Sequence, residues 1–137
     1  MERPLVLFLC THNAARSQLA EGLLRARHGD RYRAASAGTA PGRVHPLAVE
    51  ALREVGVDAS AHTSKPVSAF PDGAEYVVTV CDNAREACPV FLGATRLLHW
   101  PFPDPAHATG TDDERMAVFR TVRDSIADRI RTWMAEA

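Results

Sequence analysis

The chain has 137 residues, of which 46% are hydrophobic and 24% are charged, and its formal net charge at pH 7 is −1. This length suits one domain with a sizeable core, and we expect residues 1–137 to form that domain. The balanced charge, the lack of a membrane-length apolar run and the lack of a signal peptide predict no nucleic-acid and no membrane partner. Three cysteines, an odd number, argue against a secreted disulfide framework and favour the cytoplasm.

Strand and helix patterns alternate along the chain. The expected elements, in chain order, are a strand at 4–9, a helix from Ser17 to about Gly29, a strand at 32–37, a helix at 45–55, strands at 74–80 and 95–100, and a last helix from a capping box at 111–114. Such alternation predicts a parallel sheet with helices on both sides. We therefore expect an α/β protein, three-layer αβα, with a central four-stranded parallel sheet.

The turn between the first strand and the first helix carries a cysteine and an arginine in the order Cys10-Thr11-His12-Asn13-Ala14-Ala15-Arg16-Ser17. Backbone N–H groups that gather at a helix N-terminus bind tetrahedral oxyanions, and an arginine adds a two-pronged donor. The same positive field favours the thiolate form of a cysteine, to which Ser17 is placed to donate.

We therefore predict that Cys10 is a nucleophile and that an oxyanion is bound by the residues that follow it, Thr11, His12, Asn13, Ala14, Ala15, Arg16 and Ser17. The alternative is that Cys10 is an ordinary small core residue at the end of a buried strand. His12 is interpreted as a donor within the loop rather than a metal ligand, and no metal site is predicted.

The other two cysteines, Cys81 and Cys88, follow the strand at 74–80. If the segment between them were helical, they would lie about 10.5 Å apart along the axis, whereas a disulfide needs Cα atoms within about 7 Å. A Cys81–Cys88 disulfide therefore requires the segment to unwind or loop. A redox pair is favoured because Cys81 should face Cys10 across one rim of the sheet. The alternatives are two unrelated core cysteines or half of a zinc site, for which no partner motif is present.

Asp104 follows the strand at 95–100 in a proline-rich loop. A carboxyl group held over an anion pocket can protonate a leaving oxygen, although an Asp-Pro pair is also a common turn. Cys10, Cys81 and Asp104 all follow the carboxyl ends of expected strands, where parallel sheets bind their ligands. We therefore predict that Asp104 is the general acid of a site on that rim.

Four segments together resemble the thioredoxin-coupled arsenate reductases of the low-molecular-weight protein tyrosine phosphatase-like family. They are the loop at 10–17, the turn Ser36-Ala37-Gly38-Thr39, the Cys81/Cys88 pair and the segment from Trp100 to Asp104-Pro105. The loop alone fits a phosphatase, which is the alternative function. The cysteine pair favours a reductase, as does Ala106, where the phosphatases typically carry tyrosine. A metalloid sensor would need a DNA-binding helix and a basic patch, and neither is apparent.

The resemblance implies a complete reaction. Arsenate would be held by the loop and Arg16, Cys10 would attack the arsenic, and Asp104 would protonate the departing oxygen. Cys81 would then attack the Cys10 sulfur, arsenite would leave, and Cys88 would free Cys10 by forming a Cys81–Cys88 disulfide. Thioredoxin would reduce that disulfide, with no bound cofactor, although a glutaredoxin or a mycothiol-type reductant also fits.

Some members of this group bind potassium beside the loop, at positions that correspond to Asn13, Glu21, Thr63 and an acidic residue. In this chain the acidic position is Lys65. One hypothesis is that the Lys65 ammonium replaces the ion, pairing with Glu21 and bracing Asn13. The alternative is that Lys65 is an ordinary surface lysine.

Overall fold

Four parallel strands form the central sheet in the order β2-β1-β3-β4. Their bounds are Leu5–Cys10 for β1, Arg33–Gly38 for β2, Ala74–Cys81 for β3 and Ala94–Phe102 for β4. The computed structural model describes residues 3–81 and 94–136, so Cys88 and the expected unwinding after Cys81 lie outside the described residues. Because all the paired strands are parallel, their carboxyl ends lie at one edge of the sheet.

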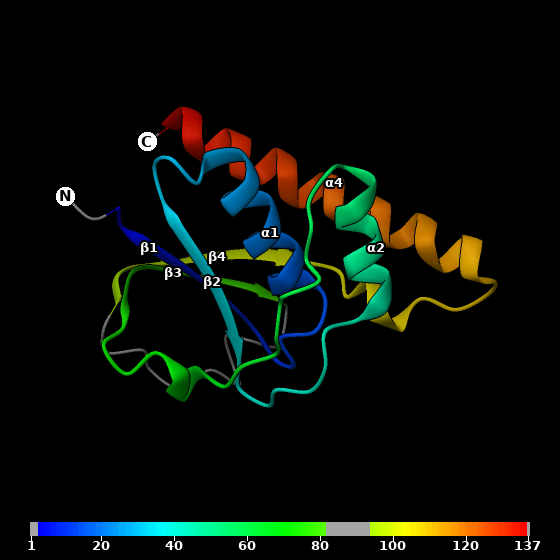
Figure 1. The fold of residues 1–137 in the computed structure, drawn as a ribbon, viewed down its shortest axis with the longest axis horizontal. Coiled ribbons are helices and arrows are strands. Elements are labelled where there is room, and N and C mark those ends of the chain that lie inside the picture. The colour runs from blue at the N-terminus through cyan, green and yellow to red at the C-terminus, as the bar shows by residue number, and fades with distance from the viewer. Residues whose placement is uncertain (1–2, 82–93, 137) are drawn as a thin grey trace.

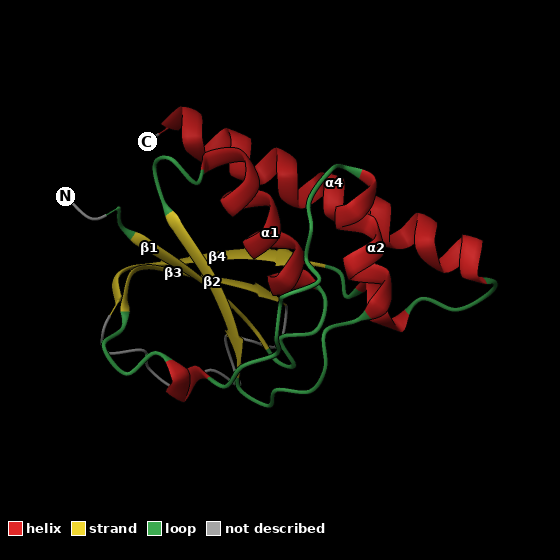
Figure 2. Cartoon of the chain, in the orientation of Figure 1, coloured by secondary structure: helices red, strands yellow, loops and turns green. Residues whose placement is uncertain are grey.

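Three α-helices cover one face of the sheet, as Figures 1 and 2 show. They are α1 (Arg16–His28), α2 (Pro46–Glu54) and α4 (Asp112–Glu136). Within the described residues the opposite face is covered by the short 3₁₀ helix η1 (Val67–Ala69) and its flanks, which pack through Val67 and Phe70. The four-stranded parallel sheet and the α/β class are thus as the sequence predicted.

Strand β1 is buried along nearly its whole length, because successive side chains enter two different cores. Val6, Phe8 and Cys10 belong to the core under the helices, whereas Leu7 and Leu9 belong to the core on the other face. This arrangement explains why the strand is a continuous apolar run, and it places Cys10 on the helix side of the sheet.

The element bounds agree with the sequence prediction within a few residues, with β4 as the largest difference. This strand continues through Pro101 to Phe102. A proline lacks the N–H group that a ladder needs, and it is tolerated at the edge of a sheet, where β4 lies. The extension places the Phe102 carbonyl and the following Asp104 next to the loop at 10–17.

Helix α4 is fastened to α2 by an ion-pair network. Glu54, the last residue of α2, accepts hydrogen bonds from Arg120 Nε and Nη2 and from Arg123 Nη1 on α4. Arg123 also donates to the backbone oxygen of Ala51 in α2. The hydrogen bonds from Arg120, followed by those from Arg123, lower the pKa of Glu54 to about 2.

We predict that Glu54→Gln lowers the stability of the protein at neutral pH. Because the folded pKa of Glu54 lies below its ordinary value, the carboxylate stabilises the fold fully above that ordinary value and ceases to do so as the pH falls toward about 2. The difference in urea midpoint between wild type and variant should therefore be constant above about pH 5 and shrink at lower pH. Glu50→Gln is the control, because Glu50 pairs with Arg53 on its own helix and does not join two elements. An equal loss in both variants would contradict the prediction.

Candidate functional site

The backbone of the loop between β1 and α1 has its carbonyl groups turned outward. The Thr11, His12 and Ala14 oxygens accept hydrogen bonds from the backbone N–H groups of Ala40, Gly42 and His45 at 2.8, 3.1 and 2.9 Å. The Asn13 oxygen accepts from Gln18 Nε2 at 3.0 Å. In a trans peptide the C=O and the next N–H point in opposite directions, and no cis peptide occurs in the described residues. The N–H groups of residues 12 to 15 therefore point into the loop, as an anion site requires.

Asn13 holds this loop in shape from its centre. Its φ of 50° lies in the left-handed region, which asparagine tolerates better than most residues. Its buried side chain is fixed at both ends: Oδ1 accepts from the Lys65 backbone N–H at 2.9 Å, and Nδ2 donates to Ser17 Oγ at 2.7 Å. The asparagine thus joins the loop to a second chain segment and orients Ser17.

The loop also presses against the end of β2. A Cβ atom at Gly38 would lie 2.6 Å from the Thr11 oxygen, 2.9 Å from the Asn13 nitrogen and 3.0 Å from the Cys10 oxygen. All three are backbone atoms, so only glycine allows the strand to approach this closely. The Gly38 N–H in turn donates to the Lys65 oxygen at 2.8 Å.

Cys10 and Arg16 occupy opposite ends of the loop. The Cys10 side chain is buried, and its Sγ lies 2.8 Å from Ser17 Oγ. Because Ser17 Oγ already accepts from Asn13, its own proton is available for the sulfur. Arg16 is 9% exposed and donates from Nη1 to the Phe102 oxygen at 3.1 Å. The sulfur is therefore held by Ser17 at one end of the loop, and the guanidinium by the Phe102 carbonyl at the other.

Asp104 reaches the same place from the loop after β4, beside the short helix η2 (Pro105–His107). Its Oδ2 lies 3.4 Å from Arg16 Nη2 and 3.1 Å from His107 Nε2. Its Oδ1 accepts from the Ala106 backbone N–H at 3.0 Å. The structure therefore brings Asp104 beside the arginine of the loop, and the turn geometry expected of an Asp-Pro pair is present at the same time.

Cys81 is the last residue of β3, the strand next to β1. The register pairs Leu9 with Thr79 and Cys81 with Phe102, so the backbones of Cys10, Cys81 and Phe102 end at the same edge of the sheet. This placement of the Cys81 backbone agrees with the predicted common rim.

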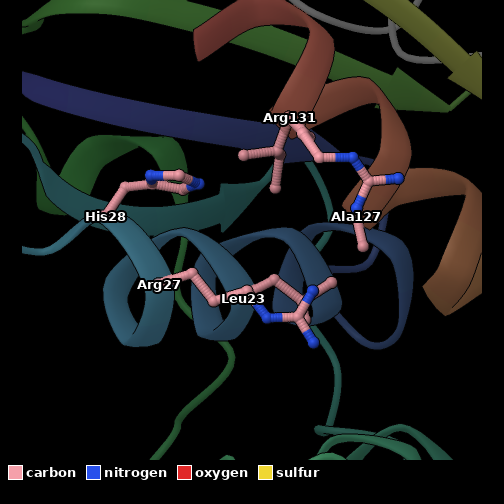
Figure 3. Close-up of a pocket in the computed structure, with 6 residues that line it drawn as sticks. Leu23, Arg27, His28, Ala127 and Arg131 are labelled. Atoms are coloured by element: carbon pink, nitrogen blue, oxygen red, sulfur yellow. The ribbon is translucent and has the colours of Figure 1, made fainter. Parts of the chain in front are cut away.

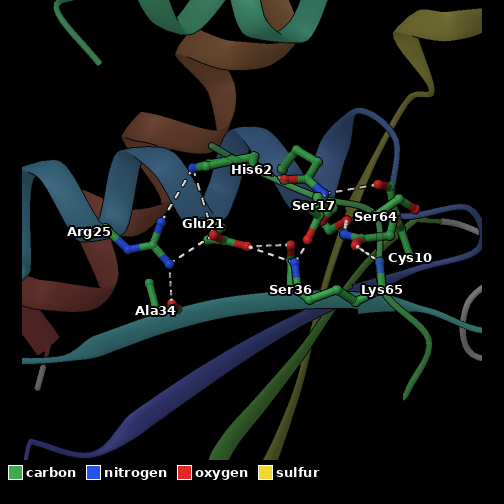
Figure 4. Close-up of polar contacts among 12 residues, drawn as sticks. Cys10, Ser17, Glu21, Arg25, Ala34, Ser36, His62, Ser64 and Lys65 are labelled. Carbon is green, nitrogen blue, oxygen red and sulfur yellow. Dashed lines mark hydrogen bonds and ion pairs between the residues drawn. The ribbon is translucent and has the colours of Figure 1, made fainter. Parts of the chain in front are cut away.

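A buried carboxylate lies behind the loop, on α1 (Figure 4). Glu21 accepts from Ser36 Oγ at 2.5 Å, pairs with Arg25 at 2.8 Å, and lies 3.9 Å from Lys65 Nζ. Lys65 Nζ also donates to the Thr63 oxygen at 2.7 Å. Lys65 therefore does pair with Glu21, whereas its contact with Asn13 comes from its backbone N–H and not from the ammonium.

This cluster is a poor fit for potassium. The arginine and the lysine already supply two positive charges to the one carboxylate, and a further cation would be repelled by both. In the part of the chain that the structure describes, no group of three or more His, Cys, Asp or Glu side chains is arranged to hold a metal ion.

Two further buried side chains, Gln18 and His62, belong to this network. The sequence did not predict either of them. Gln18 donates to the Asn13 and Thr63 oxygens, and its Oε1 lies 3.0 Å from His62 Nδ1. Burial lowers the pKa of His62 more than neighbouring Glu21 raises it, so the ring is neutral at pH 7 and Nδ1 is the donor to Gln18. The sequence offers no signal for Gln18, because it lies on the opposite side of the helix from the apolar stripe of Leu19, Ala20, Leu23 and Leu24.

The fold and the site together define a class of protein, an α/β protein with a cysteine and an arginine in a loop of inward-pointing N–H groups at the carboxyl edge of a parallel sheet. The chain belongs to the low molecular weight phosphotyrosine protein phosphatase family, whose model matches residues 5–137. None of the helices within residues 3–81 and 94–136 is long and apolar enough to cross a membrane.

Within this family the chain is similar to several arsenate reductases. It is 43% identical to the arsenate reductase of Halalkalibacterium halodurans over 134 residues, which cover 97% of this chain and 96% of that protein. Its structure is similar to an arsenate reductase in the phosphate binding state, with a TM-score of 0.82, 31% identity and coverage of 97% and 98% of the two chains. The thioredoxin-dependent arsenate reductase of Corynebacterium glutamicum matches with a TM-score of 0.70 and 29% identity over 98% of this chain and 64% of that one.

We predict that Gly38→Ala disrupts the loop, because the added methyl group collides with three backbone atoms that cannot move independently. Overpacking of this kind costs about 1–3 kcal/mol, measurable as a lower free energy of unfolding in urea. Arsenate or phosphate should also protect Cys10 from alkylation less well than in the wild type. Gly42→Ala is the matched control, since a Cβ at that position meets no atom within 4 Å. Equal behaviour of the two variants would show that the close approach at Gly38 is unimportant.

We also predict that potassium neither stabilises nor activates the protein, because Lys65 and Arg25 already neutralise Glu21. Melting temperature and arsenate-dependent turnover should be the same in equimolar KCl and NaCl. The comparison variant is Lys65→Met, which removes the ammonium and should make the melting temperature depend on potassium. Stimulation of the wild type by potassium would refute the idea that the lysine stands in for an ion.

Proposed function

We propose that this enzyme reduces arsenate to arsenite through a relay of Cys10, Cys81 and Cys88, with thioredoxin as the electron donor. The observation that carries the proposal is that Cys10 and the Cys81 backbone lie at the carboxyl ends of two neighbouring strands, β1 and β3. The family's arsenate reductases, at about 40% identity to this chain, support the choice of arsenate as the substrate. A thioredoxin-dependent structural neighbour supports the choice of reductant.

In the first step the inward N–H groups of residues 12 to 15 and the Arg16 guanidinium hold the arsenate oxygens. The Cys10 thiolate attacks arsenic, and an arsenic–oxygen bond breaks. The departing oxygen takes a proton from Asp104, whose Oδ2 lies beside Arg16. Ser17 favours the thiolate before the attack, since its hydroxyl proton faces the sulfur.

The second step moves the electrons. The Cys81 thiolate attacks the Cys10 sulfur, and the electron pair of the sulfur–arsenic bond leaves with arsenite, so that arsenic is reduced and two thiols become a disulfide. Cys88 then attacks Cys81 and frees Cys10. Thioredoxin then reduces the resulting Cys81–Cys88 disulfide and is itself oxidised. A cytoplasmic location suits this relay, because the donor must be kept reduced.

A second candidate function is hydrolysis of a phosphate ester. The observation in its favour is the family itself, whose model is that of a phosphotyrosine protein phosphatase. Hydrolysis uses Cys10, Arg16 and Asp104 but needs neither Cys81 nor Cys88. The two functions are therefore separated by the second and third cysteines.

We predict that Cys88→Ser limits the enzyme to a single turnover, because a Cys10–Cys81 disulfide forms and no thiol is left to open it. In an assay with thioredoxin, thioredoxin reductase and NADPH, arsenite should be released once per enzyme molecule and steady NADPH oxidation should stop. Cys81→Ser should fail to release arsenite at all.

Circular dichroism and protection of Cys10 by arsenate serve as the controls for folding and binding in both variants. If either variant retained full multiple-turnover reduction with thioredoxin, the three-cysteine relay would be wrong, and hydrolysis would become the leading function.

A further inference from the structure

Three groups lie against the Asp104 carboxyl group. Its Oδ1 accepts a backbone hydrogen bond from Ala106, and its Oδ2 faces the Arg16 guanidinium at 3.4 Å and His107 Nε2 at 3.1 Å. A carboxylate cannot donate a proton, so the acid proposed for the first step needs a source of one.

Oδ2 is the oxygen through which that proton can arrive, since Oδ1 is occupied by the Ala106 N–H. Arginine does not give up its proton in proteins, so Arg16 cannot supply it. His107 can, because imidazole changes charge between about pH 5 and 8. Its side chain is 84% exposed and exchanges protons with solvent, whereas that of Asp104 is 21% exposed.

The other imidazole near Asp104 is that of His45, which precedes α2. Its Nδ1 accepts from the Leu47 backbone N–H at 3.1 Å, which ties the ring to the start of the helix. Burial is the main cause that lowers the pKa of His45, and Arg115 on α4 lowers it further, against a smaller opposite effect of Asp104. His45 is thus a neutral helix cap and a poor proton source at neutral pH.

We propose that His107 and Asp104 share one proton, which His107 passes to Asp104 Oδ2 and which Asp104 then gives to the leaving oxygen. The inference rests on the acid role proposed for Asp104 above. His107 does not touch the substrate, so it is a positioning residue that controls the protonation of Asp104.

The proton balance of this step is closed. The sulfur–arsenic bond forms, the bond from arsenic to a hydroxyl oxygen breaks with its electron pair on oxygen, and the hydroxyl group takes the proton of Asp104 and leaves as water. Asp104 is then a carboxylate and His107 a neutral imidazole, and the pair regains its one proton from solvent through His107. No oxidant or reductant takes part at this stage.

The test is the pH dependence of kcat/KM for arsenate in wild type and His107→Gln, expressed as the ratio of the two. The ratio cancels the titration of arsenate, of Cys10 and of the coupling enzymes, and kcat/KM reports the steps up to the attack on arsenic. Because glutamine cannot carry the proton, we expect kcat/KM of the wild type to exceed that of His107→Gln about tenfold near pH 6. This difference is smaller than the full effect of a general acid. The ratio should fall toward unity by about pH 8.5.

His28→Gln is the matched control. His28 ends α1 far from the loop and lines a cavity of about 230 Å³ between α1 and α4, together with Arg27 and Arg131 (Figure 3). Its removal deletes one imidazole without touching Asp104, so the ratio of wild type to His28→Gln should stay at unity throughout the pH range.

Asp104→Asn separates this inference from the proposed function. It should lower kcat/KM about a hundredfold or more, and His107→Gln should then have no additional effect, because the two residues act in series. A pH-independent ratio for His107→Gln, with Asp104→Asn impaired, would overturn the role of His107 alone. An unimpaired Asp104→Asn would overturn both roles. If the wild type reduced no arsenate, the same ratio measured on phenyl phosphate hydrolysis, which needs the same proton, would decide the role of His107.

Discussion

The orientation of four consecutive peptide groups, from Thr11 to Ala15, is the constraint on which the site depends. Their carbonyl groups are bound on the outside by the backbone of residues 40–45 and by the Gln18 amide. Because a trans peptide places its N–H opposite its C=O, this outer binding turns the N–H groups inward. The protein thus orients the inward N–H groups by binding the carbonyl groups on the other side of the same peptides. The left-handed φ of Asn13 closes the arc.

The parallel sheet adds the second constraint, which is where the reacting groups can meet. Cys10, Cys81 and Asp104 are far apart in the sequence, yet Cys10 and Cys81 end β1 and β3 and Asp104 follows β4, all at one edge of the sheet. The function proposed above has the Cys10 sulfur attack a tetrahedral anion held by the loop. What happens to the covalent adduct depends on whether water or a second thiol reaches it. A cysteine at the end of the neighbouring strand favours the thiol, which is the basis for proposing a reductase within a phosphatase family.

Two carboxyl groups near the site, those of Glu21 and Asp104, have different surroundings. Glu21 is buried and surrounded by Ser36, Arg25 and Lys65, behind the loop. Asp104 lies at the front, partly exposed, with Oδ2 beside Arg16 and His107. The difference arises from solvent access and from the groups that face each carboxylate. One group is suited to hold structure and the other to move a proton.

The sequence by itself determined the order of strands and helices, the loop from Cys10 to Ser17 and the rim on which Asp104 would lie, because periodicity, caps and strand ends are local signals. Only the tertiary structure decided where Gln18, His62 and His107 lie and which groups they contact. Their partners lie on other elements or depend on the course of a loop, and single-residue patterns carry no information about such contacts. The same holds for Gly38. Only glycine fits at this position, because a Cβ atom would lie within 3.0 Å of three backbone atoms of the loop.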